Sequence, residues 1–376
     1  MFVNKITYQK DVHGFINSLI EKAIAMNASD IHIDPKSDCV GIRLRISGVL
    51  HDSGILELEY LDLCIGKIKV LAELRSDVHD KTQDGRFYYI SDILRERIDI
   101  RVSIAPTFYG ENCVMRLLRP ELLKYRTFAE LGMTTSQIGR YTSSLKKSSG
   151  LIIVAGPTGS GKTSTLYATL RYLMKGTDVE HIYSEELDTD RNIVTIEDPV
   201  ESAIPGIRQI QVHHDKGFGF KEALRGILRQ DPDVVMIGEI RDKETAIAAI
   251  QTSLTGHLVL ATIHAPNAAS IIPRLIDMGI EPYMISSSIS LVLSQRLIRV
   301  FDYKIGLYGE RKGVFEIVPV DTAMRDMIHK KKTPYEIEQY LTETGHVLLR
   351  DACQDMYVRH VTTEEEINRI ALDIYS

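Results

Sequence analysis

The first third of the chain carries two kinds of hydrophobic spacing. From residue 11 to residue 27, apolar residues recur every three or four positions, which predicts one face of a helix: Val12, Phe15, Ile16, Leu19, Ile20, Ala23 and Ile24. Apolar and polar residues then alternate over residues 31–34 and 40–46, the pattern of half-buried strands. Residues 61–74 again have helical spacing, and Gln83-Asp84-Gly85-Arg86 is expected to form a turn that opens a strand-rich stretch. Residues 1–122 are therefore expected to form a small α+β domain.

The pattern changes after a stretch at residues 123–149 that we interpret as a linker and lead-in. Short apolar runs at residues 151–155, 192–196, 233–237 and 258–263 alternate with segments of helical spacing such as residues 164–174. Strands that alternate with helices indicate an α/β fold with a parallel sheet. We expect this core to span residues 150–300 and to be followed by a small helical part at residues 301–376.

The composition excludes several classes of protein. The chain has 376 residues and a formal net charge of −6, which argues against general nucleic-acid binding, and no direct contact with nucleic acid is expected. No apolar run approaches the roughly 18 residues of a membrane span, and the N-terminus lacks the apolar core of a signal peptide, so a cytoplasmic protein is expected. The four cysteines have no C-x-x-C spacing, which indicates neither a disulfide framework nor a zinc site: Cys39, Cys64, Cys113 and Cys353.

One segment predicts nucleotide binding. It has the spacing G-x-x-x-x-G-K-[ST] and consists of Gly156, Pro157, Thr158, Gly159, Ser160, Gly161, Lys162 and Thr163. The glycines let backbone N–H groups converge on an anion, Lys162 can reach the β- and γ-phosphates, and the Thr163 hydroxyl can ligate Mg²⁺. The segment lies between a predicted strand and a predicted helix, whose first residue, Ser164, we include in the expected nucleotide site. A phosphate would then lie at the N-terminus of a helix, where the helix dipole favours it.

Carboxylates follow two of the predicted strands. Glu197, Asp198 and Glu201 follow the strand at residues 192–196, at the strand end where ligands bind in open α/β sheets. One of these carboxylates can polarise an attacking water, and the residues leave Glu197 and Glu201 equally open for that role. The strand at residues 233–237 ends in Gly238-Glu239, so we expect Glu239 to deliver a carboxylate to the metal ion.

Two further kinds of residue are candidates for the same chemistry. His264 follows the strand at residues 258–263 and can sense the γ-phosphate or orient the water. The first domain is rich in arginine in its later half, and a guanidinium brought in by a closing domain can neutralise charge on the γ-phosphate. Arg101 and Arg116 are the candidates for that role.

These motifs together resemble the traffic ATPases that drive type II secretion, type IV pilus assembly and retraction, and competence pili. The matching pieces occur in the family's order over nearly the whole chain: residues 28–33, Gln83-Asp84-Gly85-Arg86, Pro106 with Gly110-Glu111, the segment from Gly156 to Thr163, the acidic box ending at Glu201, Gly238-Glu239-Ile240-Arg241-Asp242, Thr255-Gly256-His257-Leu258-Val259 leading to His264, and Gln295-Arg296-Leu297.

The resemblance implies a hexameric motor that hydrolyses ATP with Mg²⁺ and moves pilus or pseudopilus machinery of the inner membrane. It implies an N-terminal PAS-like domain, a RecA-like ATPase domain, and peripheral association with a membrane platform protein at the cytoplasmic face. Carried over position by position, Glu201 is the catalytic glutamate and Glu239 the glutamate that supports Mg²⁺ together with Thr163. His264 matches the histidine-box residue, and Arg101 and Arg116 match the arginines offered to the γ-phosphate.

The chain also departs from the family pattern. The four-cysteine zinc module expected after residue 297 is absent, because residues 301–310 contain no cysteine. Ser47-Gly48 replaces the usual Asp-Gly, and residues 177–191 are expected to form an acidic surface insertion. The lack of these cysteines is typical of a retraction motor, whereas residues 313–318 and 362–365 resemble those of extension and secretion motors. Of these two alternatives we favour an extension or secretion motor. A regulatory homologue that binds nucleotide but barely hydrolyses it is a third interpretation.

Overall fold

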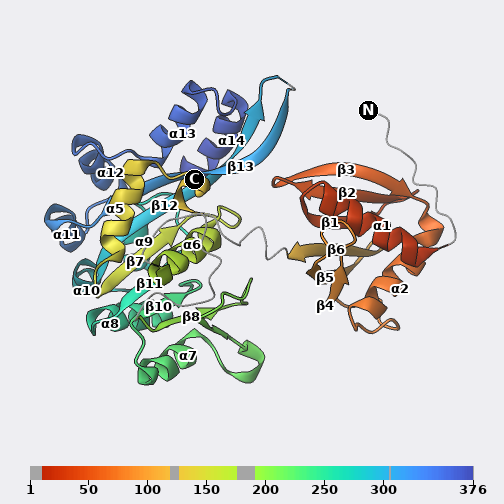
Figure 1. Cartoon of the computed structure of the whole chain (residues 1–376), viewed down its shortest axis with the longest axis horizontal. Coiled ribbons are helices and arrows are strands. Elements are labelled where there is room, and N and C mark those ends of the chain that lie inside the picture. Colours follow the sequence, from red (N-terminus) through yellow and green to blue (C-terminus); the bar gives the residue numbers. More distant parts are fainter. Residues whose placement is uncertain (1–10, 119–126, 176–190, 305, 376) are drawn as a thin grey trace. The chain divides into compact units, whose positions relative to one another are not determined.

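The chain folds into two compact units, Met1–Leu122 and Leu123–Ser376 (Figure 1). The computed structural model describes residues 11–118, 127–175, 191–304 and 306–375. The acidic insertion expected at residues 177–191 lies outside the described residues except for Arg191. Within the described residues, no helix is both long and apolar enough to cross a membrane.

The first unit is a six-stranded antiparallel sheet with two helices, and its strand order is β3-β2-β1-β6-β5-β4. Its elements in chain order are α1 (Val12–Ala25), β1 (Ala28–Pro35), β2 (Val40–Ile46), β3 (Val49–Leu56), α2 (Leu61–Leu71), β4 (Gln83–Ile90), β5 (Arg97–Thr107) and β6 (Gly110–Leu118). The two helices bury their apolar faces in one core with the sheet, where Ile20 of α1 and Ile68 of α2 join Ile31 and Ile33 of β1. The helical and alternating patterns therefore meet in a single core, as amphipathic elements require.

The predicted turn at Gln83-Asp84-Gly85-Arg86 is wrong, because these residues begin strand β4. Each of them pairs with a residue of β5, and Arg86 lies opposite Arg101. The stretch is polar because its residues alternate between half-buried and exposed positions on a two-sided strand. A Cβ atom on Gly85 would lie 2.6 Å from the carbonyl oxygen of Ala72, so the glycine serves a close approach rather than a turn.

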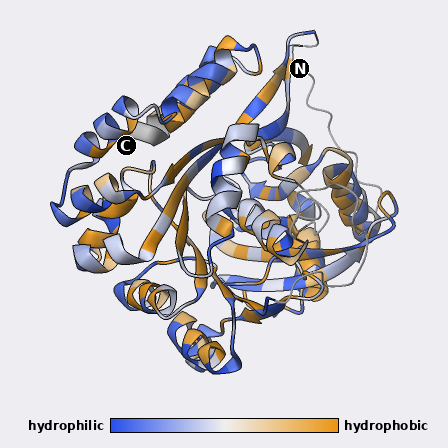
Figure 2. Ribbon diagram, turned by 60° about the vertical axis from the view of Figure 1, so that its left-hand side comes forward, coloured by the Kyte–Doolittle hydropathy of each residue, from blue (hydrophilic) through white to orange (hydrophobic). Residues whose placement is uncertain are grey.

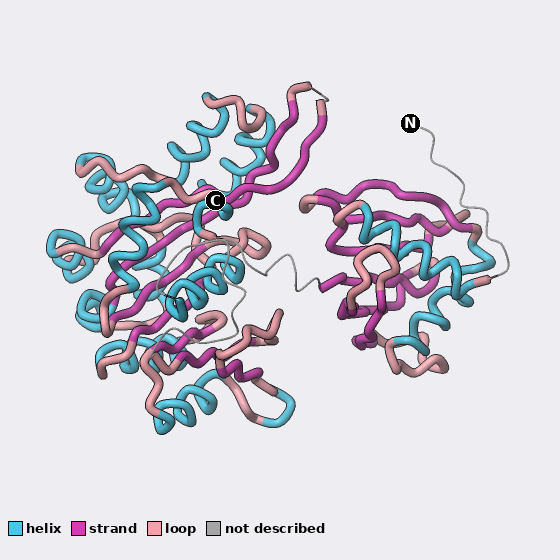
Figure 3. Tube along the Cα trace, viewed as in Figure 1, coloured by secondary structure: helices cyan, strands magenta, loops and turns pink. Residues whose placement is uncertain are grey.

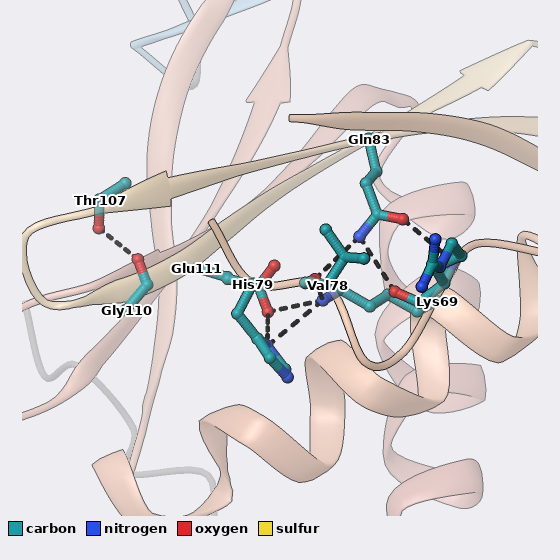
Figure 4. Close-up of polar contacts among 8 residues, drawn as sticks. Lys69, Val78, His79, Gln83, Thr107, Gly110 and Glu111 are labelled. Atoms are coloured by element: carbon teal, nitrogen blue, oxygen red, sulfur yellow. Dashed lines mark hydrogen bonds and ion pairs between the residues drawn. The ribbon is translucent and has the colours of Figure 1, made fainter. Parts of the chain in front are cut away.

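A cluster of hydrogen-bonded polar side chains joins the connection between α2 and β4 to strand β6 (Figure 4). Lys69 Nζ donates hydrogen bonds to Glu111 Oε2 at 2.8 Å and to the carbonyl oxygen of Val78 at 2.6 Å. His79 Nδ1 lies 2.8 Å from the same carboxylate oxygen, and Gln83 Nε2 donates to the Val78 carbonyl at 3.0 Å. Gly110 and Glu111, singled out in the sequence, are thus the start of the strand that receives this cluster.

The second unit is built on a seven-stranded sheet with the order β13-β12-β7-β11-β10-β8-β9 (Figure 3). All neighbouring strands are parallel except β12 and β13, which form an antiparallel hairpin. The strands are β7 (Gly150–Ala155), β8 (Ile193–Glu197), β9 (Arg208–Gln211), β10 (Val234–Ile237), β11 (Leu258–Ile263), β12 (Ile289–Asp302) and β13 (Leu307–Pro319). The four apolar runs of the sequence are the central strands β7, β8, β10 and β11, which are buried on both faces.

Helices cover both faces of this sheet. Ile152 and Val154 of β7 share one core with α4 (Phe128–Leu131), α5 (Thr135–Leu145) and α6 (Lys162–Lys175). Leu151 and Ile153 point to the opposite face. The core on that face includes helices α7 (Phe220–Ile227), α8 (Lys243–Leu254), α9 (Ile271–Asp277), α10 (Pro282–Ser288), α11 (Thr322–His329) and α12 (Pro334–Glu343). These helices carry both hydrophobic and hydrophilic residues, as Figure 2 shows, because each buries only one face.

At both ends of the second unit, the structure can be compared with the expected linker at residues 123–149 and the expected helical part at residues 301–376. In the stretch expected to be a linker, residues 128–145 form α4 and α5, where Phe128 and Tyr141 are fully buried against the sheet. Beyond residue 300 the sheet continues through β13 to Pro319, so strand precedes the helices there. Helices α13 (Leu349–Val358) and α14 (Glu364–Tyr375) pack on Ile298 and Val314 of the β12–β13 hairpin.

Candidate active site

The loop between β7 and α6 carries the predicted phosphate-binding residues. β7 ends at Ala155 and α6 begins at Lys162, so residues 156–161 form the connection. Gly161 has a φ of +89°, and a Cβ atom there would lie 3.0 Å from Gln295 Nε2, so this position favours glycine. The loop therefore ends at the N-terminus of a helix, whose unpaired N–H groups and dipole favour an anion.

Lys162 lies folded over this loop. Its Nζ donates hydrogen bonds to the carbonyl oxygens of Gly156, at 2.8 Å, and of Pro157, at 2.9 Å. Burial lowers the pKa of Lys162 to about 8, a shift that nearby Glu239 opposes and Arg296 reinforces. A phosphate group nearby would raise this pKa again, because an anion stabilises the charged ammonium, so this lysine is suited to an anionic ligand.

Glu239 and His264 meet at the ends of neighbouring strands. Gly238, directly after β10, donates its N–H to the Ile196 carbonyl at 2.8 Å, and a Cβ atom on it would lie 3.2 Å from that oxygen. The glycine before the acid thus lets the chain pass close to β8. His264 Nε2 lies 3.7 Å from Glu239 Oε2, and Arg241 forms an ion pair with the same carboxylate. Burial and the charge of Lys162 lower the pKa of His264, which keeps the imidazole neutral near pH 7.

The structure distinguishes Glu197 from Glu201. Glu197 is 3 % exposed, and its two oxygens accept hydrogen bonds from Tyr167 Oη at 2.6 Å, Thr195 Oγ1 at 2.5 Å and Gln209 Nε2 at 3.1 Å. A carboxylate engaged by three donors has little capacity left for a water molecule. Both glutamates line the cavity beside the phosphate-binding loop, but Glu201 is only partly buried.

A cavity of about 490 Å³ brings together most of the predicted residues of the second unit; Gly156, Pro157 and Ser160 are not among the residues that line it. Its lining includes Thr158, Gly159, Gly161, Lys162, Thr163, Ser164, Glu201, Glu239 and His264. Leu297 and Arg311, from the β12–β13 hairpin, also line it. Arg311 carried no signal in the sequence, because nothing in residues 301–319 indicates that a second hairpin strand returns beside the nucleotide loop.

Gln295 and Arg296 of the motif Gln295-Arg296-Leu297 form hydrogen bonds to two loops of the site, the phosphate-binding loop and the loop after His264. Gln295 Nε2 donates to the Ser160 carbonyl at 2.7 Å, and Arg296 Nη2 donates to the Pro266 carbonyl at 2.7 Å. Both side chains are almost fully buried. β12 therefore joins the phosphate-binding loop to the loop that follows His264.

The two candidate arginines belong to the first unit. Arg101 of β5 and Arg116 of β6 lie directly opposite each other in the antiparallel pair. Arg116 Nε donates to Asp30 Oδ1 at 2.9 Å, and 63 % of its side chain is exposed. Both arginines thus belong to one small area of the first unit's sheet.

The donor set of the cavity fits a nucleotide with a bound Mg²⁺. Lysine, backbone N–H groups and a helix N-terminus suit the phosphates. Mg²⁺ is commonly held by one or two protein ligands together with phosphate oxygens and water. The Thr163 hydroxyl and the Glu239 carboxylate, which line the same cavity, are of the required oxygen type.

This fold and this site define a P-loop ATPase. Residues 7–369 match the family model described as "Type II/IV secretion system protein". The chain is 38% identical to the type II secretion system protein HxcR of Pseudomonas aeruginosa, over 95% of this chain and 77% of that protein. It is 35% identical to the type IV pilus assembly ATPase PilB of Thermus thermophilus, over 94% of this chain and 42% of that protein. The chain belongs to the type II/IV secretion system protein family.

Solved structures have a similar fold. The pilus retraction motor PilT with bound ADP is similar with a TM-score of 0.67 and 25% identity, over 94% of this chain and 96% of that chain. The ATPase DotB of Legionella pneumophila is similar in fold with a TM-score of 0.76 and 20% identity, over 98% of this chain and 99% of that chain.

Proposed function

We propose that this ATPase is the motor of type IV pilus or type II secretion pseudopilus assembly, with ATP hydrolysis coupled to closure between its two units. The observation that carries the proposal is the single cavity shared by Lys162, Thr163, Glu201, Glu239 and His264. It holds a phosphate-binding loop, candidate metal ligands and a candidate general base within one compact unit. The chain's relatives, a type II secretion protein and a pilus assembly ATPase, support the biological role.

In the proposed mechanism, Glu201 accepts a proton from the water that attacks the γ-phosphorus of ATP. The bond between the γ-phosphorus and the bridging oxygen to the β-phosphate breaks, and ADP and inorganic phosphate leave. Lys162 and the N–H groups of the loop hold the phosphates, and neutral His264 orients the water or the γ-phosphate. Thr163 and Glu239 would hold Mg²⁺, which would neutralise charge on the phosphates.

The proposal also includes the first unit, which we take to be a PAS-like domain that offers Arg101 and Arg116 to the γ-phosphate. The second unit would be a RecA-like ATPase domain, with residues 123–149 as the linker and lead-in and residues 301–376 as its C-terminal part. Six chains would form a ring that docks on a platform protein at the cytoplasmic face of the inner membrane. Static light scattering with and without a non-hydrolysable ATP analogue tests the ring: a mass of six chains is expected with the analogue, and a monomer under both conditions contradicts it.

Assembly is favoured over retraction by the two relatives described above. One is a secretion protein 38% identical to the chain, and the other is a pilus assembly ATPase 35% identical to it. Deleting the gene should abolish pili or secretion if the motor assembles them. Excess pili in the deletion strain would instead identify a retraction motor.

Steady-state phosphate release tests hydrolysis and separates the motor from a regulatory homologue. Glu201→Gln removes the general base, and a fall of about 100-fold or more in turnover is expected. Glu239→Gln should also lower turnover strongly, because a metal ligand loses its charge. Glu244→Gln is a matched control, since Glu244 is an exposed carboxylate of α8 paired with Lys221. Hydrolysis unchanged in Glu239→Gln, or a wild type that binds ATP without releasing phosphate, would refute this function.

A further inference from the structure

Tyr167 connects the helix that begins the phosphate-binding site to the loop that carries Glu201. It lies in α6 and is fully buried. Its hydroxyl donates a hydrogen bond to Glu197 Oε2 at 2.6 Å. The hydroxyl oxygen of Tyr167 in turn accepts hydrogen bonds from the backbone N–H of Glu201 at 3.3 Å and of Ser202 at 3.4 Å. One side-chain atom thus contacts both ends of the acidic loop.

Glu197 fixes the direction of this hydroxyl. Its carboxylate accepts the hydrogen bond of the Tyr167 hydroxyl and further hydrogen bonds from Thr195 and Gln209. Burial and the neighbouring Glu197 raise the pKa of Tyr167, which keeps the phenol protonated. The hydroxyl oxygen is therefore left to accept, from the two backbone N–H groups and from Gln209 Nε2 at 3.5 Å.

The loop after Glu201 is held separately. Gln209 of β9 donates from Nε2 to the Ser202 carbonyl at 2.9 Å and accepts from the Ile204 N–H at 2.6 Å. These bonds fix the far side of the loop to the edge of the sheet. The backbone of Glu201 itself is fixed to α6, through the Tyr167 hydroxyl.

We propose that Tyr167 is a positioning residue for Glu201: its hydroxyl ties the backbone of the general base to the helix whose N-terminus binds the phosphates. The distance between base and γ-phosphate is then set by two points on one helix, Lys162 at its first residue and Tyr167 further along it. A general base misplaced by about 1 Å can lose on the order of 100-fold in rate. This inference rests on the proposed role of Glu201.

Tyr167→Phe tests the proposal because it keeps the buried ring and removes only the hydroxyl. We expect kcat to fall about 10- to 100-fold, while KM and the affinity for a fluorescent ATP analogue stay within about twofold. Tyr141→Phe is the matched control. Tyr141 lies in α5 and is equally buried, and its hydroxyl is hydrogen-bonded at 2.7 Å to Thr169 of α6, away from the acidic loop. Its turnover should match the wild type.

The combination with Glu201→Gln shows whether Tyr167 acts through Glu201. If it does, Tyr167→Phe lowers the residual turnover of Glu201→Gln by less than about twofold, since a base that is already absent cannot be misplaced. An equal fall in both backgrounds, or wild-type kcat in Tyr167→Phe, overturns the inference and leaves the proposed function intact. Wild-type turnover in Glu201→Gln overturns both.

A second variant covers the case in which Tyr167→Phe fails to fold because Glu197 loses a donor. Tyr167→Phe/Glu197→Gln removes the buried negative charge, and thermal unfolding followed by circular dichroism checks its folding. Its kcat should lie about 10- to 100-fold below that of Glu197→Gln alone. Equal kcat in these two variants overturns the inference.

Discussion

Lys69 Nζ lies 2.8 Å from Glu111 Oε2 in the first unit, and the two side chains are 0 % and 9 % exposed (Figure 4). A buried ion pair adds little net stability compared with apolar residues, but removing one partner leaves an unpaired buried charge. This pair also fixes the connection from α2 to β4, since Lys69 bonds the Val78 carbonyl as well. The cost of breaking the pair should therefore exceed the cost of replacing it.

Lys69→Met should lower the free energy of unfolding of the first unit by about 3–5 kcal/mol, because the Glu111 carboxylate stays buried without its ammonium partner. Lys69→Met/Glu111→Leu should recover part of that loss. Urea unfolding followed by circular dichroism measures both. Arg75→Gln breaks the exposed pair with Asp77 and should leave unfolding unchanged. A double variant less stable than Lys69→Met would contradict this account.

The buried carboxyl of Glu316 should make the stability of the second unit depend on pH. This carboxyl of β13 is 1 % exposed, and it accepts a hydrogen bond from the Ala268 N–H at 3.1 Å. Burial raises its pKa to about 7 from an ordinary value of 4.5. The folded state then binds more protons than the unfolded state between these values. The stability that the carboxyl contributes is complete below pH 4.5 and is lost as the pH rises through 7.

Between pH 5 and pH 7.5, the free energy of unfolding of the wild type should therefore fall by about 2–3 kcal/mol relative to Glu316→Gln, which exchanges no proton there. Urea unfolding at the two pH values measures the difference. Glu343→Gln, at an exposed position of α12, should follow the wild type at both. Parallel curves for wild type and Glu316→Gln would show that this carboxyl does not titrate as expected.

Much of the fold could be predicted because local patterns decide it. The buried strands β7, β8, β10 and β11 have mostly apolar sequences, and the glycine and lysine spacing of the phosphate-binding loop is local. Gln83 to Arg86 were misassigned to a turn because an exposed strand face and a polar turn have the same composition. Only the pairing with β5 separates the two.

The sequence around Glu197 and Glu201 does not show which of the two is the general base. Glu197 ends strand β8 and Glu201 follows it, and the burial of Glu197 depends on Tyr167 and Gln209, which belong to other elements. Arg311 is a similar case, since the β12–β13 hairpin brings it to the cavity. Contacts between elements distant in the sequence therefore decide the details of this site.

Arg101→Ala should leave ATP binding nearly intact and lower turnover by at least about tenfold, because an arginine that meets the γ-phosphate stabilises charge that grows in the transition state. Phosphate release and titration of a fluorescent ATP analogue separate the two effects. Arg97→Ala is the control from the same strand, since its guanidinium stacks on Tyr88 at 3.5 Å. If binding and turnover fall equally in Arg101→Ala, the arginine is a ground-state contact.

Gln295→Leu should weaken nucleotide binding, because the phosphate-binding loop loses its support from β12. Gln295 is 1 % exposed, and its Nε2 donates to the Ser160 carbonyl at 2.7 Å. Leucine has a similar volume but no donor, so the loop is free to leave the conformation in which its N–H groups converge. A fall of about tenfold in affinity for a fluorescent ADP analogue corresponds to one such hydrogen bond inside a protein. Gln251→Leu, on the exposed face of α8, should bind like the wild type. Unchanged affinity in Gln295→Leu would mean that the loop keeps its shape without β12.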